Sequence, residues 1–359
     1  MSAARRQSIH PPYLFRDMAY FVNPITYGGK QPTAEELKAK MLLEPPTEQI
    51  DLKTLGFQIQ EGVKSSTTDY SVTAARKVTR RDTGCGTWTP SGDLLTMASN
   101  TIEVWPLKIE LEECAQRFDG TILELAKKKG HATDDDLTGT QLEEIVREAL
   151  SPVVYEDMIR ILFLSDRAAA SPDYNQIDGL RKKLLAKATA GKVVRGAAIV
   201  AADIEADYTK ALDVLEDAYK KQPAALKNVA KGNKVYFIDE VLYDAVEEAR
   251  IRFGNNSNGA ALESGKAELF SGIEEIRYRG ILVKKLPQYH QYMSQDFAGQ
   301  SPHICILTVP TTIVVAMDQE SDLAEITMWY NIDERKNKTR VLYRLGVGFA
   351  YDQLIVFSI

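Results

Sequence analysis

The sequence predicts an α+β fold in which helical and strand segments follow one another in blocks along a chain of 359 residues. Three observations predict it. A Pro- and Gly-rich beginning leads into short strand patterns, a long apolar helix pattern follows, and the C-terminal residues return to strands. The chain is 44% apolar, which is enough for a sizeable core, and its length suits one large irregular domain or two.

The first segment, residues 1–55, favours an extended arm. It is rich in Pro, Gln, Thr and Gly, with Pro pairs at 11–12 and 45–46. One short helix is expected there, capped by Thr33 with Glu36 three residues later. The rest cannot bury much of its own surface, so we interpret it as an arm that packs on other chains or as disordered.

Residues 56–110 are typical of a long two-stranded ribbon. Short β-prone pieces are separated by Gly- and Pro-rich turns, and residues 101–109 alternate as a half-exposed strand does. Lys77, Arg80 and Arg81 near the tip disfavour folding back on a core. Because an isolated hairpin is only marginally stable in water, this ribbon needs a surface to lie on.

Residues 107–165 are predicted to be helical, with the clearest pattern at 139–164. Proline inside a helix costs about 3 kcal/mol, so Ser151 and Pro152 predict a kink, or a restart capped by Ser151. One apolar stripe is expected along this helix, formed by Leu142, Ile145, Val146, Ala149, Leu150, Val153 and Val154.

The middle of the chain mixes helices and strands. A basic helix follows residues 177–180, and a second strong helix is expected over 203–219. A strand at 235–238 precedes Asp239, a good N-cap, and an amphipathic helix over 241–251. Further strands are expected at 276–283, 304–309, 325–331, 340–348 and 353–357.

Composition excludes several classes of protein. A net charge of −6 without clustered Lys and Arg disfavours gripping duplex DNA, although it allows a shell that encloses nucleic acid. No secretory signal and no long apolar run is seen, which predicts a soluble product without a membrane span. Three cysteines (Cys85, Cys114, Cys305) without a CxxC pair argue against disulfides and structural zinc and fit a reducing cytoplasm.

No motif predicts catalytic, cofactor-binding or metal-ligating residues. The histidines lack metal-ligand spacing, and there is no GxSxG or GxxxxGK[ST]. Gly346, Val347 and Gly348 have no helix after them, so they do not predict a phosphate site. The acidic run at 134–136 is explained by the helix N-terminus that follows it. We expect His303 to be a satisfied edge residue and Cys305 to be inert packing.

An arm, a ribbon, a long helix and a returning set of strands leave unpaired edges and apolar surface on a monomer, and neighbouring chains would cover them. At this level the sequence resembles the major capsid proteins of tailed bacteriophages with the Hong Kong 97-like fold. The residues that carry the resemblance are Asn100-Thr101-Ile102-Glu103-Val104, Ile177-Asp178-Gly179-Leu180, 235–250, Tyr278-Arg279-Gly280-Ile281-Leu282-Val283, and 345–349 followed by 354–356.

The resemblance implies a set of structural regions. They are an N-terminal arm (1–55), an extended loop (56–110), a peripheral domain with a long spine helix (111–194), an α/β axial domain (195–324) and return strands of the peripheral domain (325–359).

The resemblance also implies a function. The chain would self-assemble into hexamers and pentamers of an icosahedral head that encloses double-stranded DNA without sequence-specific binding. A separate scaffold and a portal protein would be partners, and the virion, assembled in the cytoplasm of a bacterial host, would be the location. No enzyme activity is expected.

We expect Arg80 and Trp88 on the ribbon, and Arg277 and Tyr278 near the axial domain, to lie at subunit interfaces. Some members of the family join a loop lysine to an asparagine of a neighbour; here Asn337 and a ribbon lysine occupy suitable segments, and nothing marks them as activated. Two alternatives remain open. One is an encapsulin-like compartment shell, and the other is an α/β enzyme with an unrecognised site in residues 234–283.

Overall fold

The computed structural model describes residues 52–74, 79, 95–118, 135–255, 275–297, 299–319 and 325–359. Most of the predicted arm, its expected helix and the tip of the ribbon lie outside these residues. The chain forms two compact units. The smaller unit contains Ile109–Pro152 and Glu325–Val341, and the larger contains all the remaining described residues, in Thr47–Lys108, Val153–Ala324 and Leu342–Ile359.

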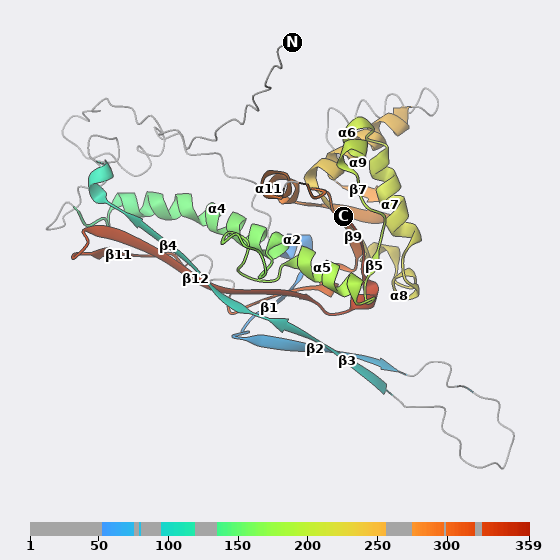
Figure 1. The fold of residues 1–359 in the computed structure, drawn as a ribbon, viewed down its shortest axis with the longest axis horizontal. Coiled ribbons are helices and arrows are strands. Elements are labelled where there is room, and N and C mark those ends of the chain that lie inside the picture. Colours follow the sequence, from blue (N-terminus) through green and yellow to red (C-terminus); the bar gives the residue numbers. More distant parts are fainter. Residues whose placement is uncertain are drawn as a thin grey trace, which may run out of the picture. The chain divides into compact units, whose positions relative to one another are not determined.

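A six-stranded mixed sheet forms the centre of the larger unit (Figure 1). Its central strand β6 (Val235–Asp239) pairs in parallel with β8 (Ile281–Leu286) and antiparallel with β9 (Cys305–Thr308). All residues of β6 are buried. This explains its continuous apolar sequence, because both of its faces are covered. In spatial order the strands are β5 (Val194–Arg195), β13 (Val356–Ser358), β9 (Cys305–Thr308), β6 (Val235–Asp239), β8 (Ile281–Leu286) and β7 (Ile276–Tyr278).

Two helices, α7 (Lys210–Lys220) and α9 (Glu240–Asn255), pack against this sheet and against each other. Leu215 and Leu242 are fully buried between the helices and Tyr236 of β6. The predicted N-cap is confirmed, since the Asp239 carboxylate accepts a hydrogen bond from the backbone N–H of Leu242. Short helices complete this unit: α2 (Leu52–Leu55), α5 (Leu180–Thr189), α8 (Ala224–Lys227), α11 (Tyr289–Asp296), and the 3₁₀ turns η2 (Lys231–Asn233), η3 (Pro310–Thr312) and η5 (Asp352–Leu354).

The helix expected over 203–219 is wrong as a single element. The chain forms α6 (Ala201–Ala206) and then α7, because Asp207 leaves the helical conformation. Its carboxylate accepts hydrogen bonds from both the backbone N–H and the hydroxyl of Thr209. Asp is prone to this local bonding, which competes with the helix.

The single strand expected at 276–283 is likewise wrong, because it folds into the hairpin β7–β8. Arg279 and Gly280 form its two-residue turn, with φ of 52° and 81°. Positive φ at both central positions is the conformation of the tight hairpin turn that matches strand twist, and glycine adopts it freely.

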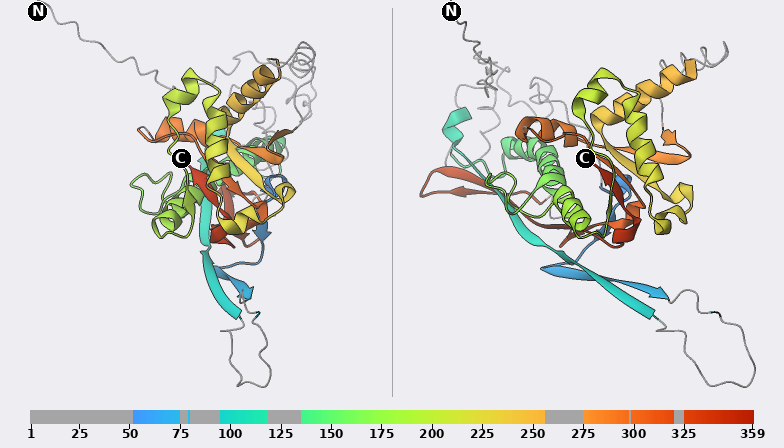
Figure 2. Two further views of the ribbon diagram at one scale, coloured as in Figure 1. Left: turned by 90° about the vertical axis from the view of Figure 1, so that its right-hand side faces the viewer. Right: turned by 45° about the vertical axis from the view of Figure 1, so that its right-hand side comes forward.

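The predicted ribbon is confirmed. Strands β2 (Ser66–Ala74) and β3 (Leu95–Glu103) pair antiparallel over nine residue pairs, from Ser66 opposite Glu103 to Ala74 opposite Leu95. At about 3.3 Å per residue this ribbon is about 30 Å long. Figures 1 and 2 show it extending away from the other described strands of the larger unit.

The ribbon starts from a second set of strands. In the larger unit β1 (Gln58–Gln60) pairs in parallel with β10 (Ile313–Met317), which pairs antiparallel with the end of β12 (Lys336–Phe349). In the smaller unit β11 (Thr327–Asn331) pairs antiparallel with the beginning of β12. Strand β4 (Trp105–Glu113) also pairs with β12.

Residues 107–113 are therefore strand, and the helical prediction for them is wrong. The alternation of Trp105, Leu107, Ile109 and Leu111 with polar residues is the strand signal that continues to Glu113. Between Glu113 and residue 118, where this described stretch ends, the helical element is the 3₁₀ turn η1 (Ala115–Phe118).

The long helix is confirmed as α4 (Gln141–Leu164), and it continues through Pro152 without the expected restart. Ile145 and Val154 of the predicted stripe are buried, and so is Met158. Val153 is exposed, so the predicted apolar stripe is narrower than the sequence pattern indicated.

Candidate interaction surfaces

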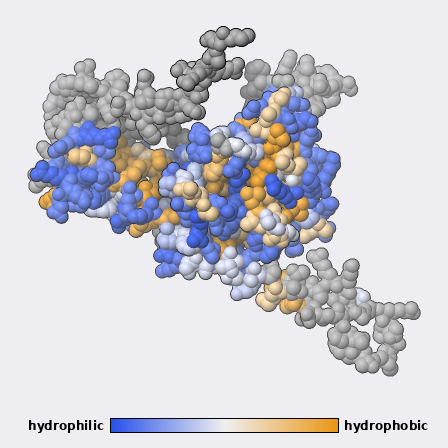
Figure 3. Space-filling model, viewed as in Figure 1, coloured by the Kyte–Doolittle hydropathy of each residue, from blue (hydrophilic) through white to orange (hydrophobic). Residues whose placement is uncertain are grey.

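The ribbon carries an apolar face that no described residue covers. Tyr70, Val72, Leu95 and Met97 are 66%, 53%, 51% and 65% exposed. Val72 is directly opposite Met97, and residues two apart on one strand share a face, so all four lie on one side of the ribbon. Figure 3 shows apolar colouring on the ribbon beside the grey residues of its tip.

Covering this face would stabilise the ribbon. Fully burying a large apolar side chain contributes about 1.5–3 kcal/mol, and more than half of each of these four is still open, so on the order of 4 kcal/mol is available. A clustered apolar surface on an otherwise marginal two-stranded element makes this face a candidate contact surface.

The root of the ribbon, in contrast, is firmly packed. Ile102 and Val104 form a buried cluster with Val314, Ala316 and Ala350. Strand β12 passes close beneath them at two glycines. A Cβ on Gly348 would lie 2.5 Å from Ile102 Cγ1, and one on Gly346 would lie 2.3 Å from the backbone oxygen of Glu103. These glycines thus allow two backbones to cross at close range.

Helix α5 contacts the same root of the ribbon through Lys183 and Lys187, which are one helical turn apart. Lys187 Nζ donates to Asn100 Oδ1 at 2.9 Å and forms an ion pair with Asp352 Oδ2 at 2.7 Å. Asn100 in turn donates to the backbone oxygen of Ala350 at 3.3 Å. The first residues of the ribbon are therefore fixed to the body by polar and apolar contacts together.

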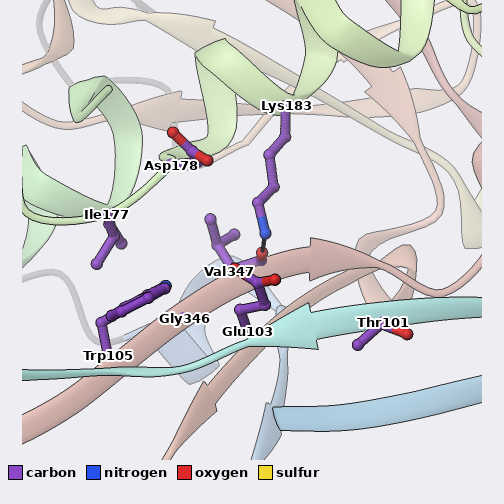
Figure 4. Close-up of a pocket in the computed structure, with 8 residues that line it drawn as sticks. All are labelled: Thr101, Glu103, Trp105, Ile177, Asp178, Lys183, Gly346 and Val347. Carbon is purple, nitrogen blue, oxygen red and sulfur yellow. Dashed lines mark hydrogen bonds between the residues drawn. The ribbon is translucent and has the colours of Figure 1, made fainter. Parts of the chain in front are cut away.

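A cavity of about 230 Å³ lies beside this root, between the ribbon, α5 and β12 (Figure 4). The Lys183 amine points across it and donates to the backbone oxygen of Val347. Burial lowers the pKa of Lys183, while the nearby carboxylates of Asp178 and Glu103 oppose that shift. Because the amine is engaged with a main-chain carbonyl, we interpret it as an anchor for β12.

Contacts of Arg167 stabilise one wall of this cavity. The Arg167 guanidinium lies 4.1 Å from the centre of the Trp105 ring and 3.9 Å from the Glu103 carboxylate. The backbone N–H of Arg167 donates to Asp178 Oδ1. Gly179, next in the chain, lies against the end of α4, where a Cβ would come within 3.0 Å of backbone atoms of Leu162 and Ser165. Residues Ile177–Leu180 therefore lead into α5 where the backbone of Gly179 contacts the end of α4.

The interface residues predicted from the sequence fall in different surroundings. Arg80 and Trp88 lie outside the described residues. Arg277 is exposed and pairs with Glu275 at 2.8 Å. Tyr278 is half-buried, and its hydroxyl donates to Glu216 at 2.8 Å. Their role at interfaces stays a prediction.

Sequence reasoning missed the apolar ribbon face. Its signal was present, because Tyr70 and Val72 alternate with polar residues and so do Leu95 and Met97. The expected edge position of His303 is wrong, because its ring is fully buried. Its Nδ1 is satisfied, since it lies 2.9 Å from the Asp239 carboxylate, while Nε2 has no partner among the described residues.

Asn337, considered as a cross-linking residue, is buried in the smaller unit. Its side chain accepts from the backbone N–H of Leu137 and donates to the backbone oxygen of Asp135. Both ends of the amide are used within the chain, which makes it a poor partner for a neighbour's lysine.

Among the described residues, no three His, Cys, Asp or Glu side chains are grouped so as to hold a metal ion. In the same part of the chain, no helix is long and apolar enough to cross a membrane.

Comparison with known proteins identifies the fold through structure alone. No protein-family model matches the chain, and no curated protein matches its sequence. Among solved structures, the capsid of Myoviridae phage XM1 matches with a TM-score of 0.53 and 16% identity, covering 92% of this chain and 99% of the other.

Two further solved structures agree. The procapsid of satellite phage P4, which includes the size determination protein, matches with a TM-score of 0.51 and 11% identity over 93% of both chains. The capsid of a native GTA particle matches with a TM-score of 0.51 and 12% identity, covering 92% of this chain and 99% of the other. The α+β, Hong Kong 97-like fold expected from the sequence is thereby confirmed.

Proposed function

We propose that this chain is a major capsid protein that assembles into hexamers and pentamers of an icosahedral phage head around double-stranded DNA. The observation that carries the proposal is the nine-pair ribbon, whose root is fixed and whose apolar face is open. Such a face is costly on a free monomer and is covered when the ribbon lies on a neighbouring copy. The likeness in fold to phage and GTA capsids supports this reading.

The proposal gives the regions of the chain structural roles. Residues 1–55 act as the arm and 56–110 as the extended loop that reaches a neighbour. Residues 111–194 and 325–359 form the peripheral domain with α4 as its spine. Residues 195–324, which supply most of the six-stranded sheet, form the axial domain around the capsomer axis. Many weak contacts then add up through multivalency.

The role is structural, and the head is the location in which it is performed. Interfaces are expected to include Arg80 and Trp88 of the ribbon and Arg277 and Tyr278 of the axial domain. A separate scaffold and a portal protein are the expected assembly partners. Enclosed DNA needs no sequence-specific contact, which agrees with the net charge of −6.

The test is assembly of the full chain after expression, measured by sizing chromatography and negative-stain electron microscopy. Closed shells, tubes or capsomer rings are expected. A Met97→Asp variant should remain folded, since Met97 is exposed, but should lose assembly because a carboxylate enters an apolar contact. Met97→Leu keeps the face apolar and should assemble like the wild type.

The outcomes separate the alternatives. Particles that contain nuclease-protected DNA support a capsid, whereas particles that contain protein cargo and no nucleic acid support an encapsulin-like shell. If the wild type, with scaffold co-expressed, forms only a discrete small oligomer, or if Met97→Asp assembles as well as the wild type, the proposal is wrong.

A further inference from the structure

A second cavity, of about 160 Å³, lies in the larger unit beside α6, α7 and the last strand β13. Three carboxylates line it: Asp203 from α6, and Asp213 and Asp217 from α7. Its other walls are mainly apolar and are formed by Ala197, Ala198, Ile199, Val200, Ile204 and Val214, with Lys210 and Ser358.

The acceptors in this cavity are only partly used. Asp217 accepts from the backbone N–H of Ala197 at 2.7 Å and pairs with Lys221 at 3.0 Å. Asp213 pairs with Lys210 at 3.3 Å, and both side chains are exposed. The Asp203 carboxylate has no hydrogen bond or ion pair to any described residue.

A buried hydroxyl adds an independent observation. Ser358 is 1% exposed and lines the cavity, yet its hydroxyl has no hydrogen-bond partner among the described residues. Gly196, directly after β5, lies against this hydroxyl. A Cβ on Gly196 would lie 2.0 Å from Ser358 Oγ. Buried hydroxyl groups without partners are uncommon, so this one indicates an absent hydrogen-bond partner, and its oxygen can accept from a donor group.

Charge and shape define what that donor is. Three carboxylates and two lysines leave a local charge of about −1 that a cation would balance. The apolar walls, including the exposed Val200, suit an aliphatic stem. An ammonium group donates in three directions and so fits acceptors that come from separate elements.

We propose that this cavity receives the side chain of a lysine from a second copy of the chain. The inference rests on the proposed function, because a shell brings a second copy against this unit. The chain itself can supply the donor, since Lys192 and Lys227 are exposed and have no side-chain partner among the described residues. The contact joins subunits through one lysine and the carboxylates of α6 and α7.

The experiment uses particles assembled from an equal mixture of ¹⁴N- and ¹⁵N-labelled chains. A water-soluble carbodiimide joins a carboxylate directly to an amine that touches it, and mass spectrometry then identifies the linked peptides. Isotopically mixed links from Asp203 or Asp213 to a lysine are expected. Links found only within one chain, to Lys210 or Lys221, would overturn the inference while leaving assembly intact.

Matched variants sharpen the test. Asp203→Asn with Asp213→Asn removes two of the carboxylates that the carbodiimide activates, so mixed links are counted at the remaining cavity carboxylate, Asp217. Their yield should fall about tenfold, the effect of losing about 1.4 kcal/mol of pairing. Asp244→Asn changes an exposed carboxylate on α9 outside the cavity and should leave the yield unchanged. An equal fall in both would refute the cavity as the site. If the wild type forms no particles, the proposed function and this inference fail together.

Discussion

The crossing of β12 beneath the ribbon root makes Gly348→Ala a demanding test of how the ribbon is held. The new Cβ would lie 2.5 Å from Ile102 Cγ1 and 2.9 Å from its Cδ1. Gly348 does not have a positive φ, so alanine fits the backbone and the effect is purely steric. Ordinary contact requires the two strands to separate by about 1 Å.

The size of the effect follows from this geometry. Overpacking a well-packed core costs about 1–3 kcal/mol. The two buried root residues, Ile102 and Val104, are about 7 Å apart along the strand, so a 1 Å displacement at one of them tilts the ribbon by about 9°. Over the roughly 24 Å from Ile102 to Leu95, that tilt moves the apolar face by about 4 Å.

Two measurements follow from these magnitudes. With a urea m-value of about 3 kcal/mol/M, the midpoint of unfolding should fall by up to about 1 M. Assembly should fall more than stability, because a face displaced by several ångströms no longer meets its partner surface. Gly232→Ala is the matched control, since a Cβ there meets nothing within 4 Å; it should be neutral or stabilising by about 0.4–1 kcal/mol.

An unfolding midpoint of Gly348→Ala equal to that of Gly232→Ala would refute a tight crossing at Ile102. A second contrary result would be a fall in stability with shells of normal size formed at the normal rate. In that case the glycine would matter for packing alone, and the direction of the ribbon would not depend on its root.

Three further predictions concern single side chains. Lys187→Met should lower the free energy of unfolding by about 1–3 kcal/mol in urea, since its ion pair with Asp352 is mostly buried. Glu216→Gln should flatten the pH dependence of thermal stability. The hydrogen bond from Tyr278 lowers the pKa of Glu216 below its ordinary 4.5, so its contribution is present above that value and is lost as the pH falls through the folded-state value. Burial raises the pKa of Cys305, so iodoacetamide should label it only after unfolding, as mass spectrometry would show.

Each of these predictions has a clear contrary result. Unchanged urea stability of Lys187→Met would mean that the ion pair contributes nothing beyond its desolvation cost. A Glu216→Gln variant that loses stability with acid as steeply as the wild type would place the titrating carboxylate elsewhere. Labelling of Cys305 in the folded protein would show that its strand opens to solvent.

Elements with one dominant period could be predicted from the sequence. The helix α4, the ribbon and the strand β6 each carry a long run with a single pattern, so local preference and tertiary packing agree. The predicted boundaries of helices and strands were wrong where the conformation of a single residue ends the element. Asp207 ended a helix through its own hydrogen bonds, and Arg279 adopted positive φ in a turn, and neither event has a strong local signal.

The candidate site was harder to predict because its parts are distant in sequence. Gly348 lies against Ile102 and Gly346 against Glu103. Lys187 contacts Asn100 and Asp352. No periodicity relates such positions, so the sequence excluded a phosphate site at these glycines without revealing the crossing that requires them. The apolar ribbon face could have been found, since alternation on both strands indicates it.

The contrast between the root and the face of the ribbon has an energetic consequence for assembly. A ribbon held only by its own strand pairs would have to be ordered when it docks, and ordering costs about 0.5–1.5 kcal/mol for each immobilised long side chain, plus the backbone. The contacts of Ile102, Asn100 and Lys187 already order the root of the ribbon when the chain folds, so much of this ordering free energy is not lost again on docking. The available apolar energy, on the order of 4 kcal/mol, is then spent on association rather than on ordering. Lys187, which holds Asn100 and Asp352 within the chain, should therefore affect assembly as well as stability.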